Sequence, residues 1–411
     1  MSKNLSGFPF SELMFWYNVS NMAGAKSQRK EPIEGTKIAV WAAAAGRCTF
    51  CNRYVLENED LGELVPIGEL AHNVGVGEKS PRGVSTLDEE QRREADNLVL
   101  LCRNCHKPVD DKGVVGRYTV EEMARLKREH EKRIRFLTEI DADRQATIVR
   151  VVGRIRDFNP ELTYDTVLGA TTAAGLLPTL LPGAHRAEYE RDLRQAPHPG
   201  STTYFSRCAE DIDDLVSRIE DGIRHDEVKR LAVFGFARIP LLIHLGAKLD
   251  DKVPTIVFQR QRVDDINAWR WPVDPPEPPL FESHVVRPGS DMQRVALLIN
   301  LSGVIRPEEL PELIDDTYSV YSITPATPAA PGPLLFSSPA ALTNFDASIR
   351  QFLVQIEAKH GKIPRISLFP AVPLSAAITL GRVLMPHVSP AWTIFDRDDM
   401  SQFFEALEVR R

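Results

Sequence analysis

Apolar residues recur along the chain in two different patterns, and the pattern changes near residue 147. Upstream of that point, residues 62–75 contain a short run rich in Val, Ile and Leu, which predicts a strand with His72 at its end. A Gly-rich stretch over residues 75–83 follows and predicts a mobile loop. The N-terminal part of the chain is therefore expected to hold short elements joined by long connections.

Two helices are expected after that loop. Residues 94–111 predict a helix that begins at Asp96 or Asn97, either of which can cap the first turn, with apolar residues following at helical spacing. Residues 119–137 predict a second, highly charged helix with a threonine cap and acidic residues in its first turn. This second helix would lie in a connector, residues 119–146, between two domains.

The downstream part of the chain alternates buried runs with amphipathic stretches, and the pattern occurs twice. Residues 229–249 parallel residues 364–384, because each segment predicts a buried strand, a turn containing proline and a helix. An amphipathic helix precedes each copy and a further strand follows it. The repeat predicts an α/β domain over residues 147–411, built of two tandem Rossmann-like halves at about 147–275 and 290–411.

Composition and charge narrow the possible partners. Hydrophobic residues make up 43% and charged residues 26% of the 411 residues, which is typical of a soluble globular protein of two or three domains. Residues 1–140 carry 21 Lys/Arg and 21 Asp/Glu, whereas residues 141–411 carry 29 and 36, so the net charge of −7 lies entirely in the second part. A C-terminal domain that recognised a DNA duplex would be basic, so this balance argues against a duplex as its ligand. A small pocket supplied with a few arginines suits a compact anionic ligand better.

The N-terminus has the pattern of neither a secretory signal nor a membrane anchor. The apolar run over residues 13–19 is too short to span a bilayer and lacks a basic start and a small-residue cleavage site. We expect no membrane partner and a loose extension over residues 1–30. Because Met22 begins a polar stretch, residues 1–21 are either part of that extension or an upstream mis-start.

The cysteines predict a metal site. Cys48 and Cys51 form one Cys-x2-Cys pair, Cys102 and Cys105 form another, and Cys208 stands alone. Each pair can present two thiolates to one Zn²⁺, and two pairs close a tetrahedral structural site that has no open position for catalysis. Paired metal ligands rather than a disulfide framework predict a cytoplasmic protein.

Residues 46–110 resemble an HNH endonuclease of the ββα-metal type. The matching segments are CTFC (48–51), ELAH (69–72) and NLVLLCRNCH (97–106), followed by Asp110. The zinc-stapled version of this family has the same two Cys-x2-Cys pairs, with the last cysteine directly before the last histidine. The resemblance therefore implies an α+β nuclease module with a four-cysteine zinc site.

The resemblance also implies a role for each polar residue of the motif. Phosphodiester hydrolysis needs an activated water and a divalent cation, here expected to be Mg²⁺. In the family the first histidine is the general base, the middle asparagine orients it or supports the metal loop, and the last histidine binds the cation. These roles fall on His72, Asn97 and His106, within a module that we place at residues 31–118.

One position departs from the family pattern. Members often carry Asp or His directly before the first histidine as a second metal ligand, but this chain has Ala71 there. The candidates for the missing ligand are Asp96, Asp110 and a backbone carbonyl.

Basic residues flank the predicted site and are candidates for contacts with DNA phosphates, which are strong but blind to sequence. For any single basic residue, a solvated charged surface is the alternative. The candidates are Lys79, Arg82 and Arg103.

The C-terminal domain is expected to bind its ligand beyond the carboxyl ends of its parallel strands. Two tryptophans near these ends can stack a purine while arginines hold phosphate, although packing in the core is an equally good explanation for both rings. The absence of GxGxxG and GxxxxGK[ST] argues against a dinucleotide cofactor or an NTPase site. The ligand-binding candidates are Arg238, Arg260, Arg262, Trp269, Trp271 and Ser302.

This duplicated domain resembles the SAVED domain, through FGFARIPLLIHLG (234–246), VFQRQR (257–262) and WRW (269–271). SAVED is a fused pair of CARF-like sensors that bind cyclic oligonucleotides, and the order HNH then SAVED is that of effector nucleases in CBASS anti-phage defence. The resemblance implies that a cyclic di- or trinucleotide, made by a cognate nucleotidyltransferase, activates cleavage of double-stranded DNA. It also implies a homo-oligomer, with a dimer expected without ligand and a higher-order assembly with it.

Two other functions compete with this one. The first is a restriction-type HNH endonuclease whose C-terminal domain recognises modified DNA, and the acidic balance of residues 141–411 argues against it. The second is a non-catalytic zinc protein that binds DNA, which leaves His72, Asn97 and His106 without a purpose.

Overall fold

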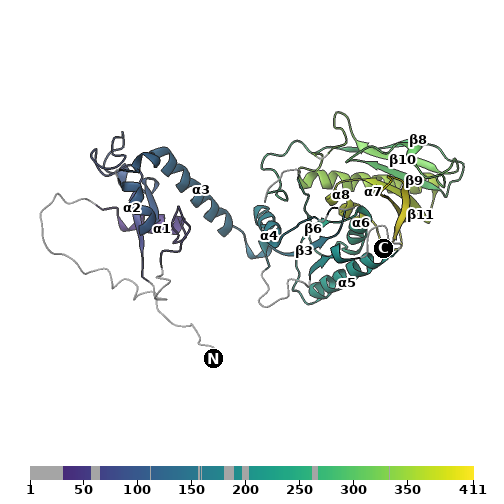
Figure 1. The fold of residues 1–411 in the computed structure, drawn as a ribbon, viewed down its shortest axis with the longest axis horizontal. Helices are drawn as coiled ribbons and strands as arrows, with labels where there is room; N and C mark the ends of the chain where they lie inside the picture. Colours follow the sequence, from purple (N-terminus) through teal and green to yellow (C-terminus); the bar gives the residue numbers. More distant parts are fainter. Residues whose placement is uncertain are drawn as a thin grey trace, which may run out of the picture. The chain divides into compact units, whose positions relative to one another are not determined.

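The computed structural model forms two compact units, one up to Arg135 and one from Phe136 (Figure 1). The predicted extension over residues 1–30 lies outside the residues that the structure describes. No helix among the described residues is long and apolar enough to cross a membrane. The described residues are 31–56, 65–111, 113–155, 158, 160–179, 189–196, 203–261, 267–332 and 334–411.

The N-terminal unit is built around a two-stranded antiparallel sheet followed directly by a helix. In the sheet, His72 pairs with Leu98 and Gly68 pairs with Cys102. The apolar residues of β2 pack with those of α1 and α2 and with Met123 of α3 in one small core. The elements of this unit are α1 (Glu34–Ala43), β1 (Gly68–His72), β2 (Leu98–Cys102), α2 (Arg103–Asp110) and α3 (Val120–Thr138).

The strand that ends at His72 and the charged helix are confirmed, but the helix predicted over residues 94–111 is wrong in its first half. Residues Leu98–Cys102 form the strand β2, and the helix begins only at Arg103. All five residues of β2 are buried. A strand that is covered on both faces has a continuous apolar run, and periodicity cannot distinguish such a run from a buried helix.

The C-terminal unit begins with a parallel sheet. Its strand order is β4-β3-β6-β7, with β5 also paired to β3. Three helices connect the strands. The elements are β3 (Gln145–Val152), α4 (Tyr164–Ala173), β4 (Leu177–Pro178), β5 (Glu190–Asp192), α5 (Tyr204–Arg224), β6 (Leu231–Phe236), α6 (Ile239–Lys248) and β7 (Thr255–Val257).

A second sheet follows, with the order β13-β12-β11-β9-β10-β8. Its four inner strands are parallel and its two edge strands, β8 and β13, are antiparallel to their neighbours. The elements are β8 (Phe281–Arg287), β9 (Val295–Asn300), β10 (Ser319–Pro325), α7 (Pro339–His360), β11 (Arg365–Ala371), α8 (Leu374–Arg382), β12 (Ala391–Arg397) and β13 (Phe403–Val409).

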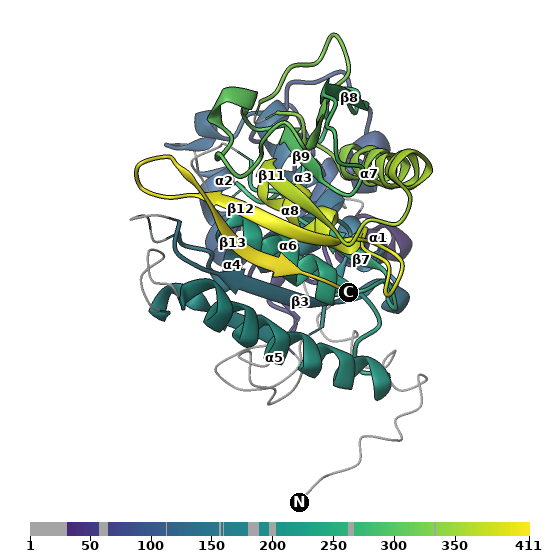
Figure 2. The same ribbon diagram turned by 90° about the vertical axis from the view of Figure 1, so that its right-hand side faces the viewer.

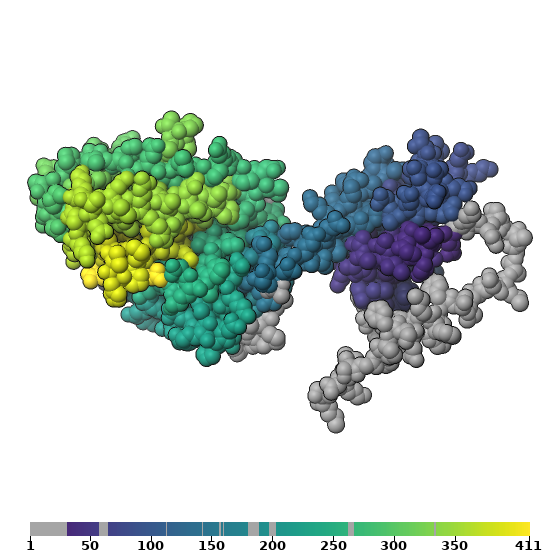
Figure 3. Space-filling model, turned by 180° about the vertical axis from the view of Figure 1, so that it is seen from behind, coloured from purple at the N-terminus to yellow at the C-terminus, as the bar shows by residue number. Residues whose placement is uncertain are grey.

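The two sheets repeat the same topology, which confirms the predicted α/β character of this unit. The order β4-β3-β6-β7 in the first sheet corresponds to β10-β9-β11-β12 in the second. Residues from both sheets and from α5 to α8 share one continuous core. Seen from behind, the teal, green and yellow segments of this unit accordingly form one continuous surface (Figure 3).

Helices α6 and α8 lie side by side where the two halves meet (Figure 2). Each carries a glycine at the crossing, and Gly381 follows Gly246 by the 135 residues of the sequence repeat. A Cβ added at Gly246 would stand 1.9 Å from the carbonyl oxygen of Ile378, and one at Gly381 would stand 1.9 Å from that of Ile243. The backbones of the two helices are therefore in direct contact at both glycines.

Replacing either glycine by alanine is expected to lower the free energy of unfolding of this unit by about 1–3 kcal/mol, because a backbone carbonyl must move to admit the methyl group. Urea unfolding of Gly246→Ala and Gly381→Ala checks this. Gly303→Ala is the matched control, since a Cβ there meets nothing within 4 Å. Equal stability of all three variants would contradict the close approach.

Candidate functional site

The four paired cysteines form one cluster in the N-terminal unit. Their Sγ atoms all lie within 4.8 Å of one another, and those of Cys51 and Cys102 are 3.7 Å apart. A tetrahedral Zn²⁺ with Zn–S bonds of about 2.3 Å separates its sulfurs by about 3.8 Å, so the donor set fits zinc. Burial raises the pKa of the Cys48 and Cys105 thiols, and a bound cation is what makes four adjacent thiolates favourable.

The fifth cysteine takes no part in this cluster. Cys208 lies on α5 in the core of the C-terminal unit. Burial raises the pKa of its thiol to about 11, so it stays protonated and unreactive at neutral pH.

His106 stands one residue beyond the cysteine cluster, on α2, between two carboxylates. Its Nδ1 lies 2.5 Å from Oε2 of Glu69 on β1, and its Nε2 lies 3.5 Å from Oδ2 of Asp110. The imidazole is 24% exposed and the two carboxylates are about half exposed, so solvent ions can reach the group. One imidazole with carboxylate oxygens is a donor set that suits Mg²⁺ or Mn²⁺.

The sequence did not single out Glu69. Ala71 is fully buried, and side chains two residues apart on a strand share a face, so Glu69 is the next position on the face of Ala71. Of the other candidates for the missing ligand, Asp110 does reach His106, whereas Asp96 precedes β2 and so lies at the far end of that strand from α2.

Asn97 holds the chain that follows His72. Its side chain is buried, Oδ1 accepts a hydrogen bond from the Val74 amide at 2.7 Å, and Nδ2 donates to the carbonyls of Val74 and Arg92 at 2.9 and 2.8 Å. The backbone amide of Asn73 also donates to the Asn97 carbonyl at 2.8 Å. These bonds fix where β1 ends, and therefore where the half-buried side chain of His72 is placed.

Two arginines, Arg82 and Arg92, form hydrogen bonds that hold in place the loop that the sequence predicts to be mobile. The Arg92 side chain donates to the carbonyls of Gly83 and Leu87 at 3.0 and 2.9 Å, and to that of Gly75. The Arg82 side chain is only 6% exposed and donates to protein groups. The structure does not favour its predicted role as a DNA phosphate contact, because four of its five N–H donors already bond groups within the protein.

The other two predicted phosphate contacts have different surroundings. Lys79 lies on the same loop and Arg103 is the first residue of α2, and both side chains are exposed. Their contact with DNA stays a prediction.

The C-terminal unit has a cleft of about 290 Å³ at the carboxyl ends of β9, β11 and β12. Arg397 lies over the ring of Phe403 at 4.1 Å and forms an ion pair with Glu309, which holds the pKa of that carboxyl below its usual range. The cleft is lined by Gly303, Val304, Ile305, Pro370, Ala371, Phe395, Asp396, Arg397 and Phe403.

Two pairs of hydrogen bonds cross between the halves of this unit. Arg238, the residue before α6, donates from Nε to Oδ2 of Asp396 and from Nη2 to the carbonyl of Arg397, both at 2.8 Å. In the opposite direction, Ser375 on α8 donates from its amide and its hydroxyl to Oε1 of Gln259, at 3.0 and 2.7 Å. Arg238, at the start of α6, is thus bonded to the end of β12, and Ser375, on α8, is bonded to Gln259 just after β7.

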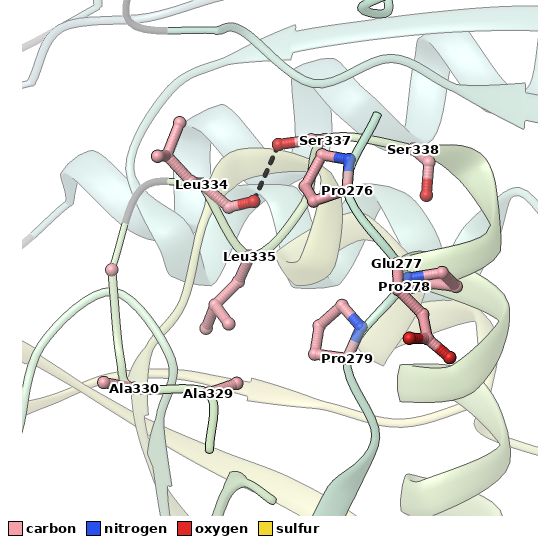
Figure 4. Close-up of a pocket in the computed structure, with 11 residues that line it drawn as sticks. Pro276, Glu277, Pro278, Pro279, Ala329, Ala330, Leu334, Leu335, Ser337 and Ser338 are labelled. Carbon is pink, nitrogen blue, oxygen red and sulfur yellow. Dashed lines mark hydrogen bonds between the residues drawn. The ribbon is translucent and has the colours of Figure 1, made fainter. Parts of the chain in front are cut away.

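Two further hollows are weaker candidates for the ligand site. One, of about 390 Å³, is lined mostly by proline, alanine and leucine (Figure 4), and Glu277 is the charged residue among its described lining residues. The other, of about 550 Å³, lies against Pro364 and Pro390, at the amino ends of β11 and β12. Ligands of parallel sheets bind at the carboxyl ends, so the cleft beside Arg397 is the better candidate.

Comparison with protein families identifies the greater part of the C-terminal unit. Residues 212–409 match the model of the SMODS-associated and fused to various effectors sensor domain, SAVED. These residues form a SAVED domain. Comparison with curated proteins gave no match, and the comparisons identify no HNH fold in the N-terminal unit.

Solved receptors with SAVED/CARF domains resemble the chain only distantly. The Acinetobacter baumannii Cap4 receptor with 3′3′3′-cAAA is 11% identical, with a TM-score of 0.41, over 71% of this chain and 61% of that one. The same receptor with 2′3′3′-cAAA is 13% identical, with a TM-score of 0.39, over 78% of this chain and 65% of that one. The Moraxella osloensis Cap4 receptor is 13% identical, with a TM-score of 0.35, over 72% of this chain and 64% of that one. The chain therefore spans less than two thirds of the length of these receptors.

The predicted ligand residues all fall within residues 212–409, the segment that matches SAVED. Ser302 is exposed next to the cleft and donates from its amide to the Ala371 carbonyl at 2.8 Å. Arg260 is half-buried after β7, with its guanidinium 5.6 Å from the centre of the Phe236 ring. Arg262 lies outside the described residues.

The two tryptophans have little surface to offer a ligand. Trp269 is 2% exposed and packs edge-on against Phe234 and Phe236 at 5.6 and 6.1 Å. Trp271 stacks on Phe258 at 6.4 Å. This packing is what the core explanation expects, so a base could stack on Trp269 only by displacing neighbouring aromatic rings.

Proposed function

We propose that this chain is a DNA endonuclease whose N-terminal HNH module is activated when a cyclic oligonucleotide binds the SAVED domain. The single observation that carries the nuclease is the order strand, strand, helix, with His72 at the end of β1 and His106 on α2 between two carboxylates. The four-cysteine cluster at the start of α2 supports the same conclusion.

In this proposal the residues of the N-terminal unit divide the work of hydrolysis. His72 accepts a proton from the attacking water, and Asn97 fixes the backbone on which that histidine stands. Lys79 and Arg103 hold phosphates of the DNA backbone. A divalent cation, when held by His106 with Glu69 or Asp110, would supply charge stabilisation at the scissile phosphate.

The two carboxylates beside His106 cannot play the same part. Glu69 faces Nδ1 and Asp110 faces Nε2, so a cation on one nitrogen leaves the other carboxylate to accept the remaining N–H. Such a carboxylate–histidine–metal arrangement is common because it fixes the ring and strengthens the ligand. Glu69→Gln and Asp110→Asn distinguish the two cases through their effects on cation affinity.

The sensing half of the proposal rests on the SAVED match, since the family is a sensor domain fused to effectors. The Acinetobacter baumannii Cap4 receptor is solved with cyclic trinucleotides, and we propose a cyclic di- or trinucleotide for this chain. In this proposal the guanidinium of Arg397, which lines the cleft, exchanges its ion pair with Glu309 for a phosphate of the ligand, and the volume of the cleft is suited to part of such a ligand. Ligand binding would then promote assembly from a dimer to a higher-order oligomer.

Plasmid cleavage with Mg²⁺, measured with a panel of cyclic di- and trinucleotides, is expected to occur only with a matching member of the panel. Arg397→Ala should raise the activator concentration needed for half-maximal cleavage by at least tenfold, because a phosphate loses its partner. Arg350→Ala is the matched control, since it removes a guanidinium that lines the hollow at the amino ends of β11 and β12. Cleavage without any nucleotide would exclude gating and favour a restriction-type enzyme, and DNA binding without cleavage would favour a zinc DNA-binding protein.

A further inference from the structure

Arg82 occupies an unusual place in the N-terminal unit. It follows Pro81 in the loop after β1 and has a positive φ of 53°, a conformation that L-residues seldom adopt. Its side chain nevertheless turns inward and is 6% exposed. An exposed cationic residue would be free to meet DNA, whereas a buried one in a strained loop position is held there by specific contacts.

The contacts of Arg82 join the two elements that carry the proposed nuclease residues. On the β1 side, Nε donates to the Asn73 carbonyl at 2.7 Å and Nη2 to the His72 carbonyl at 3.1 Å. On the α2 side, Nη1 donates to the Val109 carbonyl at 2.5 Å and Nη2 to Oδ1 of Asp110 at 3.0 Å. One planar guanidinium thus bonds both the end of the strand and the end of the helix.

The contact with Asp110 extends this connection to His106. While Oδ1 of Asp110 accepts from Arg82, Oδ2 of the same carboxylate lies 3.5 Å from Nε2 of His106. The path runs from the backbone of His72 through one guanidinium and one carboxylate to the imidazole. A carboxylate held by an arginine is a fixed partner for a metal-binding histidine.

We propose that Arg82 is a positioning residue that sets the separation between His72, the proposed base, and His106, the proposed cation ligand. The inference rests on the proposed nuclease function and goes beyond it, because nothing in the family pattern assigns this arginine. Lysine could not replace it, since one ammonium cannot make four contacts fixed in the plane of a fork.

Arg92 provides a matched control within the same loop. It is also buried, and its guanidinium also donates to backbone carbonyls, those of Gly75, Gly83 and Leu87. It differs in that the contacts of its guanidinium lie within residues 75–87 and include no group of β1 or α2. Loss of Arg92 therefore reports on the loop alone, and loss of Arg82 reports on the loop and on the connection between His72 and His106.

The test compares Arg82→Lys, Arg82→Ala and Arg92→Ala in the full chain, with Mn²⁺ as the probe. Zinc content and the thermal transition show whether each variant folds. Mn²⁺ affinity is measured by electron paramagnetic resonance, and plasmid cleavage is followed as a function of Mn²⁺ concentration with the nucleotide that activates the wild type. Methylguanidinium is added to each alanine variant to test chemical rescue.

Both Arg82 variants are expected to retain zinc, to bind Mn²⁺ about 10–100-fold more weakly, and to cleave more slowly even at saturating Mn²⁺. Methylguanidinium should restore part of the activity of Arg82→Ala and none of that of Arg92→Ala. Equal losses in Arg82→Ala and Arg92→Ala with unchanged Mn²⁺ affinity would overturn the proposal. If the wild type binds Mn²⁺ but never cleaves DNA, the nuclease function fails while the Mn²⁺ shift still decides the role of Arg82. Absence of Mn²⁺ binding in the wild type would overturn both.

Discussion

His72→Ala is expected to reduce the rate of plasmid cleavage by about 10²–10⁴-fold, the usual contribution of a general base. The imidazole stands at the end of β1, where the chain is fixed by Asn97 on one side and by Arg82 on the other. Removing the ring leaves those backbone contacts in place, so the fold and the zinc site should not change. The loss should therefore appear in the maximal rate, measured with saturating Mg²⁺ and activator.

His106→Ala separates the base from the cation ligand. It should also lower cleavage, but the loss should be accompanied by weaker Mn²⁺ binding and should be partly recovered at high cation concentration. For His72→Ala, the Mn²⁺ affinity should equal that of the wild type. A His72→Ala variant that cleaves at the wild-type rate would show that the base has been assigned to the wrong residue.

The pattern of the sequence predicts the C-terminal unit better than the N-terminal one. The repeat at 135 residues is visible because each half needs the same buried strands and the same helix crossing, and Gly246 and Gly381 are required there by a close backbone approach. In the N-terminal unit, β2 was mistaken for a helix because a strand covered on both faces loses the alternation that identifies strands.

The parts of the candidate site that sequence reasoning missed all depend on contacts between distant segments. Glu69 and His106 are 37 residues apart, and only the pairing of β1 with β2, followed directly by α2, brings them together. The sequence predicts a phosphate contact at Arg82 because a basic residue in a Gly-rich loop is usually exposed. Its burial follows from four acceptors on two elements, which no local pattern records.

The cysteine cluster lies where β2 ends and α2 begins. Cys102 ends β2 and Cys105 lies on the first turn of α2, so a metal bound there fixes the angle at which the helix leaves the strand. His106 is the next residue, and its direction toward Glu69 depends on that angle. In the proposed enzyme the two metal sites would therefore have different parts, one closed and structural and the other open to solvent.

Removing the zinc site by a double replacement, Cys48→Ser with Cys51→Ser, is expected to unfold the N-terminal unit. The core of this unit is small, and structural Zn²⁺ contributes about 10–16 kcal/mol of binding free energy that is also folding free energy. Hydrogen exchange of the full chain should show loss of protection over residues 34–135, while protection of the SAVED domain persists. Zinc content should fall in step with that loss, and cleavage should be abolished.

Cys208→Ala is the control for the chemistry of thiols. This residue lies in the other unit and outside the cluster, so its loss should leave zinc content and the exchange of residues 34–135 unchanged. Full protection of the N-terminal unit in the double variant would mean that its small apolar core is sufficient by itself. The placement of His106 would then depend on the packing of α2 against the sheet and not on the metal.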